Sequence, residues 1–338
     1  MRKLLFFVAA IGLALPALAA RNLEIFFIDV EGGQSTLIVT PARQSLLVDT
    51  GWADYSGRDA DRIVDAAKKA GVKRIDFLLV THHHLDHVGG VPNLVERMKV
   101  GTFLDHGPTV ETAKQAQGLY TAYLKAIGSS EHKVVKPGDT IPLKGVEVEI
   151  VAANGEHITT ALAGAGQPNP YCKGVERRET DPSENARSSG FVLTYGKFRF
   201  IDLGDLTWNK EMNLVCPDNL LGTVDVYLTT HHGLNQSNNP AIVDALHPRV
   251  AIMNNGAKKG GSVEAWTTVK NSPGLEDLWQ LHFAVEGGKD HNVPDSFIAN
   301  VDENGDGKYI SLSASADGGF VVTNSRNKYT KTYPPRSK

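Results

Sequence analysis

The chain has 338 residues and a formal net charge of −3, and 41% of its residues are hydrophobic while 22% are charged. This length and composition allow a large buried core in one domain or two. The acidic balance argues against strong binding to duplex nucleic acid. The basic residues cluster only near the C-terminus, from Arg326 to Lys338, where we expect a solvated tail.

Residues 1–19 have the pattern of a signal peptide. Arg2-Lys3 gives a positive start, residues 4–15 form an apolar run, and residues 17–19 match an Ala-x-Ala cleavage site. An uncleaved anchor is the alternative, but the apolar run is short for a membrane span. We therefore expect an exported chain, periplasmic or secreted from a bacterium, with no transmembrane anchor after cleavage.

The predicted elements alternate between strands and helices, which favours an α/β fold. Strands are expected over 23–30, 35–40, 45–49, 75–80, 102–105, 146–152, 190–195, 198–203, 225–229 and 249–253. Helices are expected over 59–70 and 110–127, each followed by a glycine that can end it. A loop-rich insert spans about 155–188, and we expect it to cover the functional site.

Cys172 and Cys216 are the two cysteines of the chain. They are isolated from one another and from histidine, so a metal role is disfavoured. In an oxidising compartment they can form a disulfide, and the sequence leaves both the paired and the free state open.

The C-terminal segment predicts a β-hairpin, with strands over 308–314 and 319–323 joined by Asp317-Gly318. Residues 302–307 imitate the start of a calcium loop, but its twelfth position is Ser313 instead of the required glutamate, so an acidic turn is preferred. Just before it, His291 lies in a polar stretch beside a proline. It is either a substrate or proton-transfer residue or part of a surface turn.

The run from Thr81 to His87 concentrates the metal-binding side chains of the chain. His82, His84, Asp86 and His87 have the spacing His-x-His-x-Asp-His, directly after the strand expected over 75–80. Imidazole nitrogens and carboxylate oxygens suit zinc, iron or manganese. We expect His82 and His84 to face one ion while Asp86 and His87 face a second. A polar loop or a histidine-rich surface tract is the alternative.

This spacing resembles the signature of the metallo-β-lactamase-fold hydrolases. Asp29, at the end of the first expected strand, is similar to the aspartate that opens that family's pattern, and residues 29–35 look like the opening of the competence-protein (DNA-uptake) branch. Asp49 is similar to the aspartate that usually supports the histidine loop from behind.

Two later segments extend the resemblance. Gly204-Asp205 is similar to the Gly-Asp whose carboxylate bridges two ions, so the resemblance gives that role to Asp205. His231-His232-Gly233 resembles the segment that closes the second metal site, with His232 the preferred ligand and His231 the less favoured one. The motifs appear in the order that is usual in the family.

One element departs from the family pattern. The family often has a further histidine ligand for the first ion, and the chain offers only His106, His132 and His157 before Asp205, none in a persuasive context. Residues 184–191, with Asn185 and Ser188, look more like the Asn-x-x-Ser opening of the competence-type branch. The resemblance then implies that the first ion has fewer protein ligands than usual.

The resemblance implies a four-layer αββα sandwich with a C-terminal β-hairpin extension. It divides the chain into a signal peptide (1–19), a hydrolase domain (20–300) and a hairpin with a basic tail (301–338) packed on the same domain. It implies two divalent metal ions, zinc with manganese or iron as alternatives, which activate a hydroxide. Asp86, Asp205 and His231 are the candidate catalytic residues, and Asp29, Asp49, Asn185, Ser188 and His291 the candidate supporting or substrate-contacting residues.

The function implied is an exported binuclear phosphodiesterase acting on a small-molecule or single-stranded phosphodiester. A β-lactam or lactone hydrolase is one alternative, although the missing third histidine disfavours a β-lactamase. A non-catalytic metal-binding protein that kept the fold is the other. No P-loop or dinucleotide fingerprint is present, so no organic cofactor is expected.

Overall fold

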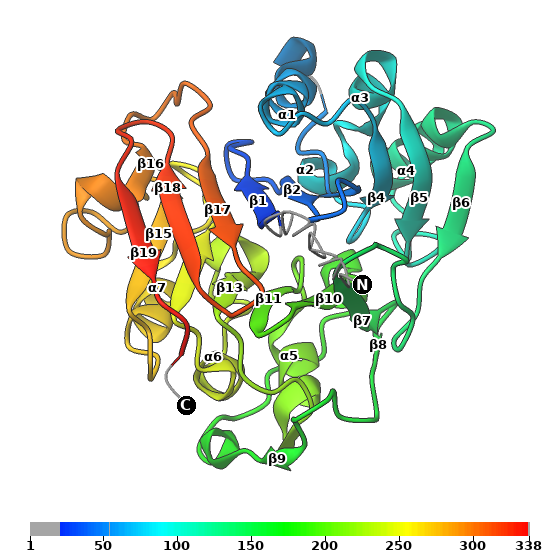
Figure 1. Ribbon diagram of the computed structural model, residues 1–338. Coiled ribbons are helices and arrows are strands. Elements are labelled where there is room, and N and C mark those ends of the chain that lie inside the picture. The colour runs from blue at the N-terminus through cyan, green and yellow to red at the C-terminus, as the bar shows by residue number, and fades with distance from the viewer. Residues whose placement is uncertain (1–20, 54, 337–338) are drawn as a thin grey trace, which may run out of the picture.

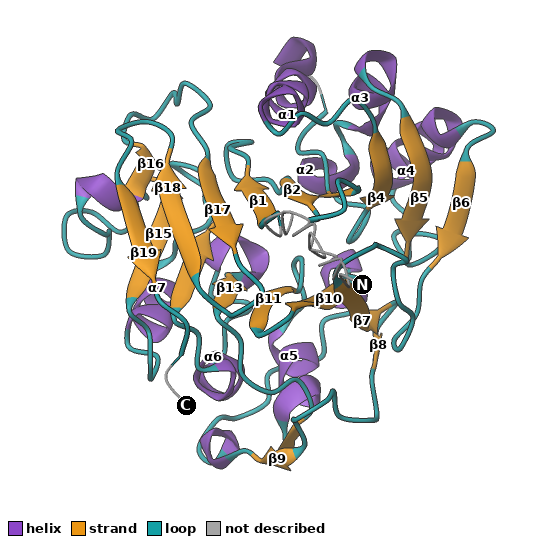
Figure 2. Ribbon diagram, in the orientation of Figure 1, coloured by secondary structure: helices purple, strands orange, loops and turns teal. Residues whose placement is uncertain are grey.

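Two large β-sheets pack face to face, and helices cover the outer face of each sheet (Figure 1, Figure 2). The computed structural model describes residues 21–53 and 55–336. One apolar cluster, with members such as Ile25, Leu46, Phe191 and Ile252, lies between the two sheets. Two further clusters join each sheet to its own helices. The predicted αββα sandwich is therefore confirmed.

The first sheet contains both ends of the described chain. Its strand order is β19 (Thr330–Tyr333), β18 (Phe320–Asn324), β17 (Ile310–Ala314), β1 (Leu23–Phe27), β2 (Thr36–Val39), β3 (Ser45–Val48), β4 (Ile75–Leu79), β5 (Val100–Asp105) and β6 (Glu131–Val134). Strands β3 to β6 run parallel. Its outer face is covered by α1 (Arg58–Lys69), α2 (Leu85–Val88), α3 (Val91–Arg97) and α4 (Lys114–Ile127).

The second sheet has the order β16 (Ile298–Asn300), β15 (Asp277–His282), β14 (Val250–Met253), β13 (Val226–Leu228), β11 (Phe198–Asp202), β10 (Gly190–Tyr195), β7 (Glu147–Ala153) and β8 (Glu156–His157). Its helices are α5 (Trp208–Val215), α6 (Pro240–Leu246) and α7 (Val263–Lys270). Helix α6 begins where the Asn239 side chain accepts a hydrogen bond from Ile242 N, with Pro240 at the first helical position.

The parallel strands explain where the chemistry gathers. Strands β3 and β4 of the first sheet and β11, β13 and β14 of the second all run parallel to a neighbour. The segments that follow their carboxyl ends carry Asp49, the histidine run, Asp205 and the pair His231-His232. Polar residues that follow parallel strands meet at one edge of a sheet, which is the usual place for a ligand site in α/β folds.

The C-terminal hairpin is confirmed. Strands β17 and β18 pair from Ile310 with Asn324 to Ala314 with Phe320. Strand β17 also pairs with β1, so the hairpin extends the first sheet. The prediction of a solvated basic tail was wrong, because residues 330–333 form β19 and Tyr333 is fully buried against the sheet.

Two other predictions differ from the structure. Helix α4 begins at Lys114, later than expected, because Thr109 and the Val110 backbone N–H are bound by Glu184. The middle of the insert does not cover the metal motifs: β9 (Gln167–Pro168) pairs with β12 (Asp218–Asn219), and a disulfide joins Cys172 to Cys216 beside α5. Only the end of the insert, at Glu184, reaches the histidine run.

The predicted signal peptide lies outside the described residues. Within residues 21–53 and 55–336, no helix combines the length and the apolar character needed to span a membrane.

The disulfide predicts a stability difference. Cys172 and Cys216 are separated by 44 positions, and closing a loop of that size stabilises a fold by about 2–4 kcal/mol. We expect the double variant Cys172→Ser/Cys216→Ser to lose about that free energy of unfolding in urea titrations without reductant. With reductant present the wild type and the variant should converge. Equal stability of the two proteins without reductant contradicts a stabilising disulfide.

Candidate metal centre

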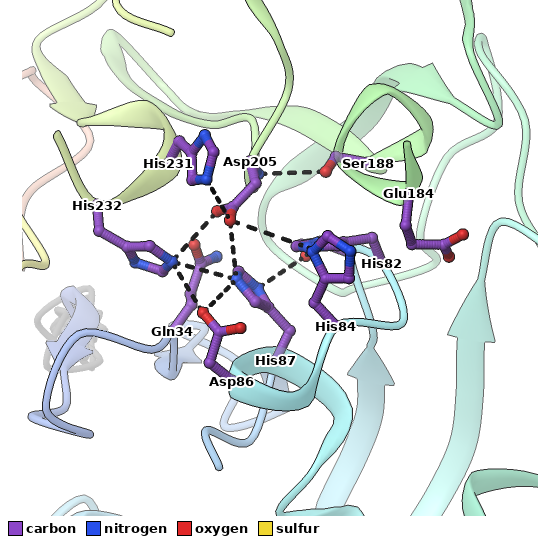
Figure 3. Close-up of polar contacts among 12 residues, drawn as sticks. Gln34, His82, His84, Asp86, His87, Glu184, Ser188, Asp205, His231 and His232 are labelled. Atoms are coloured by element: carbon purple, nitrogen blue, oxygen red, sulfur yellow. Dashed lines mark hydrogen bonds and ion pairs between the residues drawn. The ribbon is translucent and has the colours of Figure 1, made fainter. Parts of the chain in front are cut away.

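Four buried side chains from three segments converge on one point (Figure 3). They are Asp86, His87, Asp205 and His232, whose candidate ligand atoms all lie within 4.8 Å of one another. His87 Nε2 is 3.2 Å from Asp205 Oδ2 and 3.2 Å from His232 Nε2. His232 Nε2 is in turn 3.2 Å from Asp86 Oδ2. Two nitrogens and two carboxylates thus surround one small space.

This donor set fits a divalent cation. Two imidazole nitrogens and two carboxylate oxygens are the ligands that zinc takes in a four-coordinate site. The buried Asp205 Oδ1 has no hydrogen-bond partner among the described residues. Such an unsatisfied group costs roughly 1–3 kcal/mol, and a bound cation would remove that cost.

His82 and His84 form a second group beside the first. His82 Nε2 is 3.0 Å from His84 Nδ1 and 3.9 Å from Asp205 Oδ2. His231 Nε2 also approaches Asp205 Oδ2, at 3.4 Å. Asp205 therefore lies between the two groups, and the protein has the His and Asp clusters that a dinuclear metal centre needs.

The supporting contacts hold the histidine rings in fixed orientations. Asp49 accepts hydrogen bonds from Thr81 N (2.8 Å) and Thr81 Oγ1 (2.7 Å) and lies 2.8 Å from His87 Nδ1. Glu111 Oε1 is 2.9 Å from His84 Nε2, the nitrogen that points away from His82. Carboxylates behind a ligating histidine fix its tautomer and raise its basicity.

The backbone explains how Asp205 and the histidine pair reach the centre. Gly204 has φ +55°, and a Cβ at this position would lie 2.9 Å from the Thr81 Cβ, so only glycine allows the two loops to meet. His231 and His232, within the short helix η4 (Thr230–Gly233), have φ values of 55° and 56°. This uncommon left-handed conformation turns both rings toward Asp205, and such strain is frequent at functional sites.

The charges of the centre depend on one another. Burial disfavours the charged forms of Asp86 and Asp205, but the neighbouring histidines outweigh it and hold the pKa of both carboxyls well below the usual range. Burial also disfavours a charged His87, yet the nearby carboxylates hold its pKa well above the usual range. Burial and the His87 charge lower the pKa of His82. The two carboxylates and His87 thus stabilise one another's charged forms.

His83 does not face the centre. Its Nε2 donates to the Gly107 carbonyl oxygen at 2.9 Å, and its ring packs against His106. Glu184 lies 2.8 Å from His106 Nε2 and accepts from His83 N, Thr109 Oγ1 and Val110 N. Burial raises the pKa of Glu184, but these donors and the charge of His106 outweigh it and lower the pKa to about 2. This cluster fixes the outer side of the histidine run.

The remaining predicted residues lie around the centre at different depths. Ser188 Oγ accepts from Asp205 N at 3.2 Å, and Asn185 accepts the Ser188 backbone N–H. Asp29 contacts Arg62 at 3.0 Å and His282 at 2.7 Å, and it does not belong to either group of candidate metal ligands.

The other histidines have separate partners. His291 packs against Trp266 of α7, with ring centroids 5.4 Å apart. His132 is bound to Asp105, and His157 lies in β8. With His106 held by Glu184, the structure shows none of His106, His132 and His157 joining His82 and His84.

Three contacts near the centre were not predicted from the sequence. Glu111 supports His84, and Lys259 contacts Asp86. Gln34 Nε2 donates to both carboxylate oxygens of Asp202, at 3.1 and 2.9 Å, and burial raises the pKa of Asp202 to about 7. Gln34 stands in the Asp29–Ser35 segment that resembles the competence-type opening, which is a signal that points to it.

The sequence model of the metallo-β-lactamase superfamily matches residues 28–180, which include the histidine run. Over these residues the chain is similar to this superfamily. The superfamily consists mostly of metal-dependent hydrolases.

The curated relatives of the chain are distant. ComE operon protein 3 of Bacillus subtilis is 24% identical over 71% of the chain, which spans 29% of that relative's length. A UPF0173 protein of Pyrococcus abyssi is 26% identical over 69% of the chain and 86% of its own length. Hydroxyacylglutathione hydrolase of Xylella fastidiosa is 26% identical over 40% of the chain and 42% of its own length. The first match fits the resemblance to the competence-type branch.

Two solved structures are also similar. The metallo-β-lactamase fold protein YhfI of Bacillus subtilis has a TM-score of 0.47 and 10% identity, covering 77% of this chain and 96% of that one. CmlA, a diiron β-hydroxylase of Streptomyces venezuelae, has a TM-score of 0.39 and 18% identity, covering 75% and 47%.

Variants of the two adjacent histidines should differ in the amount of metal they bind. We expect His232→Ala to lose about one bound ion per chain, because His232 belongs to the four-ligand group. We expect His231→Ala to keep that ion, because its Nε2 approaches only Asp205 at 3.4 Å. Elemental mass spectrometry after metal loading measures both, with His157→Ala as the control. If His231→Ala loses the ion and His232→Ala keeps it, then His231 is the ligand and His232 is not.

Glu184 predicts a pH-dependent stability. Its pKa is lowered from 4.5 to about 2, so its contribution is full above pH 4.5 and is lost as the pH falls toward 2. We expect Glu184→Gln to lower the free energy of unfolding of the metal-free protein by about 3 kcal/mol at pH 7, and the gap to the wild type to narrow below pH 4.5. Urea titrations from pH 7 to 3 measure this, with the exposed Glu96→Gln as control. If the difference in free energy of unfolding between wild type and Glu184→Gln stays constant across this pH range, the lowered pKa of Glu184 is contradicted.

Proposed function

We propose that the chain is an exported, binuclear metal-dependent phosphodiesterase that acts on a small-molecule or single-stranded phosphodiester. The observation that carries the binuclear part is the position of Asp205. Its Oδ2 lies 3.2 Å from His87 Nε2 in one group and 3.9 Å from His82 Nε2 in the other. Asp205 could therefore supply a ligand to both proposed ions.

The proposed ligands divide between the two groups. Asp86, His87, Asp205 and His232 would hold one ion, and His82, His84 and Asp205 would hold the other, with zinc as the proposed metal and manganese or iron as alternatives. When bound, a pair of divalent ions supplies Lewis acidity and lowers the pKa of a water molecule. Asp49 and Glu111 keep the histidine rings aligned throughout.

Asp86 and His231 are the residues proposed to move protons. Asp86 Oδ2 faces the space between His87 and His232, at 3.3 and 3.2 Å from their Nε2 atoms. His231 lies on the opposite side of Asp205, with its Nδ1 3.5 Å from Ser237 Oγ. A group within hydrogen-bond reach of the reacting oxygen can accept a proton from the nucleophile or return it to the leaving group.

The charge of the loaded centre favours an anionic substrate. Two divalent cations would carry more charge than the Asp86 and Asp205 carboxylates that would bind them directly, while Asp49 and Glu111 lie behind the histidines, and this local positive charge would stabilise a phosphodiester. The similarity to ComE operon protein 3 supports the same branch of the superfamily. A β-lactam or lactone hydrolase remains the competing function, because a neutral carbonyl can be polarised by the same ions.

Export is part of the proposal. The first nineteen residues have the signal-peptide pattern, and a disulfide such as Cys172–Cys216 persists in an oxidising compartment.

The test uses the chain from residue 20 onward, loaded with zinc or manganese. We expect metal-dependent hydrolysis of bis-p-nitrophenyl phosphate that is lost with a chelator and falls by roughly 10³-fold or more in Asp205→Ala, because the shared ligand is removed. Exposed Asp61→Ala is the control. Nitrocefin and a hydroxyacylglutathione thioester are the competing substrates. Faster turnover of either one, with no phosphodiester hydrolysis, replaces the proposed function.

A further inference from the structure

Lys259 brings a positive charge to the metal centre. It follows β14, and its Nζ contacts the carboxylate oxygen Oδ2 of Asp86 directly. The ammonium also lies 5.0 Å from the centre of the Trp52 ring, within the range of a cation–π interaction. The Lys259 side chain keeps 31% of its surface exposed while Asp86 is buried. The lysine thus stands at the boundary between the centre and solvent.

The loop that carries Lys259 is fixed on both sides. Gly256 N donates to the Lys259 carbonyl oxygen at 2.8 Å, and Gly261 N donates to the His232 carbonyl oxygen at 2.9 Å. A Cβ on Gly32 would lie 2.9 Å from the Lys259 Cβ, so the first-sheet loop packs directly against the lysine. The position of the lysine is therefore set by the same contacts that position His232.

The charge balance gives Lys259 a further role. When the metal groups are filled, two divalent cations already exceed the two carboxylates of Asp86 and Asp205. The Asp86 carboxylate would partly screen the Lys259 ammonium from them, and a substrate anion that contacts both would add a second attractive partner. Lysine has three donors and acts as a point charge toward phosphate, which suits an anion that also contacts metal.

We propose that Lys259 binds the anionic oxygen of the substrate and sets the preference for anionic over neutral esters. This inference rests on the proposed function and names the group that recognises the phosphoryl charge. The Trp52 face and the glycine-packed loop hold the ammonium on the open side of Asp86.

The neighbouring lysine supplies a matched control. Lys258 is 68% exposed and pairs with Glu303, away from Asp86. The variants Lys259→Gln and Lys258→Gln remove the same charge at adjacent positions. Lys259→Arg keeps the positive charge but replaces the compact ammonium with a planar guanidinium.

Three measurements on the metal-loaded chain test the inference. The first is metal content, the second is binding of inorganic phosphate by calorimetry, and the third is kcat/KM for bis-p-nitrophenyl phosphate and for neutral p-nitrophenyl acetate. We expect Lys259→Gln to keep its metal and to lose roughly 10- to 100-fold in phosphate affinity and in kcat/KM for the phosphodiester, as for a lost charge-assisted hydrogen bond. The neutral ester should change by less than about threefold. Lys259→Arg should recover part of the loss, and Lys258→Gln should match the wild type.

Several outcomes overturn the inference. Equal losses on both esters, or unchanged phosphate affinity in Lys259→Gln, exclude anion recognition by Lys259. Tighter metal binding in Lys259→Gln means that the lysine competes with the ion at Asp86 instead. If the wild type hydrolyses no phosphodiester but phosphate binding still depends on Lys259, the proposed function fails while the anion site stands. If phosphodiester hydrolysis is normal in Lys259→Gln, the inference fails and the proposed function stands.

Discussion

The structure depends on a buried carboxylate shared by two groups of histidines. Asp205 follows β11 of the second sheet, while His82 and His87 follow β4 of the first, so their contact joins the two sheets at one edge. Burying this carboxylate is unfavourable without positive partners. The neighbouring histidines supply them and hold the pKa of Asp205 well below the usual range, and the Gly204 backbone packs closely against Thr81.

Three carboxylates outside the centre hold the histidine loop in place, and they do so from different sides. Asp49 and Glu111 orient rings that point inward. Glu184 holds the outer side of the same loop through four donors, including the backbone N–H of His83. Asp49 and Glu184 are both buried, so water does not compete for their hydrogen bonds. A centre held in this way is pre-organised to bind a cation, because its side chains need little reorganisation.

The sequence was sufficient for the sandwich and for the residues that converge, because strand periodicity, metal-ligand spacing and the Gly-Asp and His-His-Gly segments are local signals. The sequence was insufficient where a contact depends on a residue far away along the chain. Nothing near Glu111 marks it as the partner of His84, and Lys259 meets Asp86 only because two sheets pack together. The later start of helix α4 likewise depends on Glu184, which lies far away along the chain.

The pairing of β1 with β17 also shapes how the chain can fold. Leu23 lies opposite Ala314, so the first described strand acquires this neighbour only after nearly the whole chain is present. Pairings between such distant segments carry a large loop-closure cost and slow folding. A polypeptide emerging from the ribosome therefore cannot complete its first sheet early.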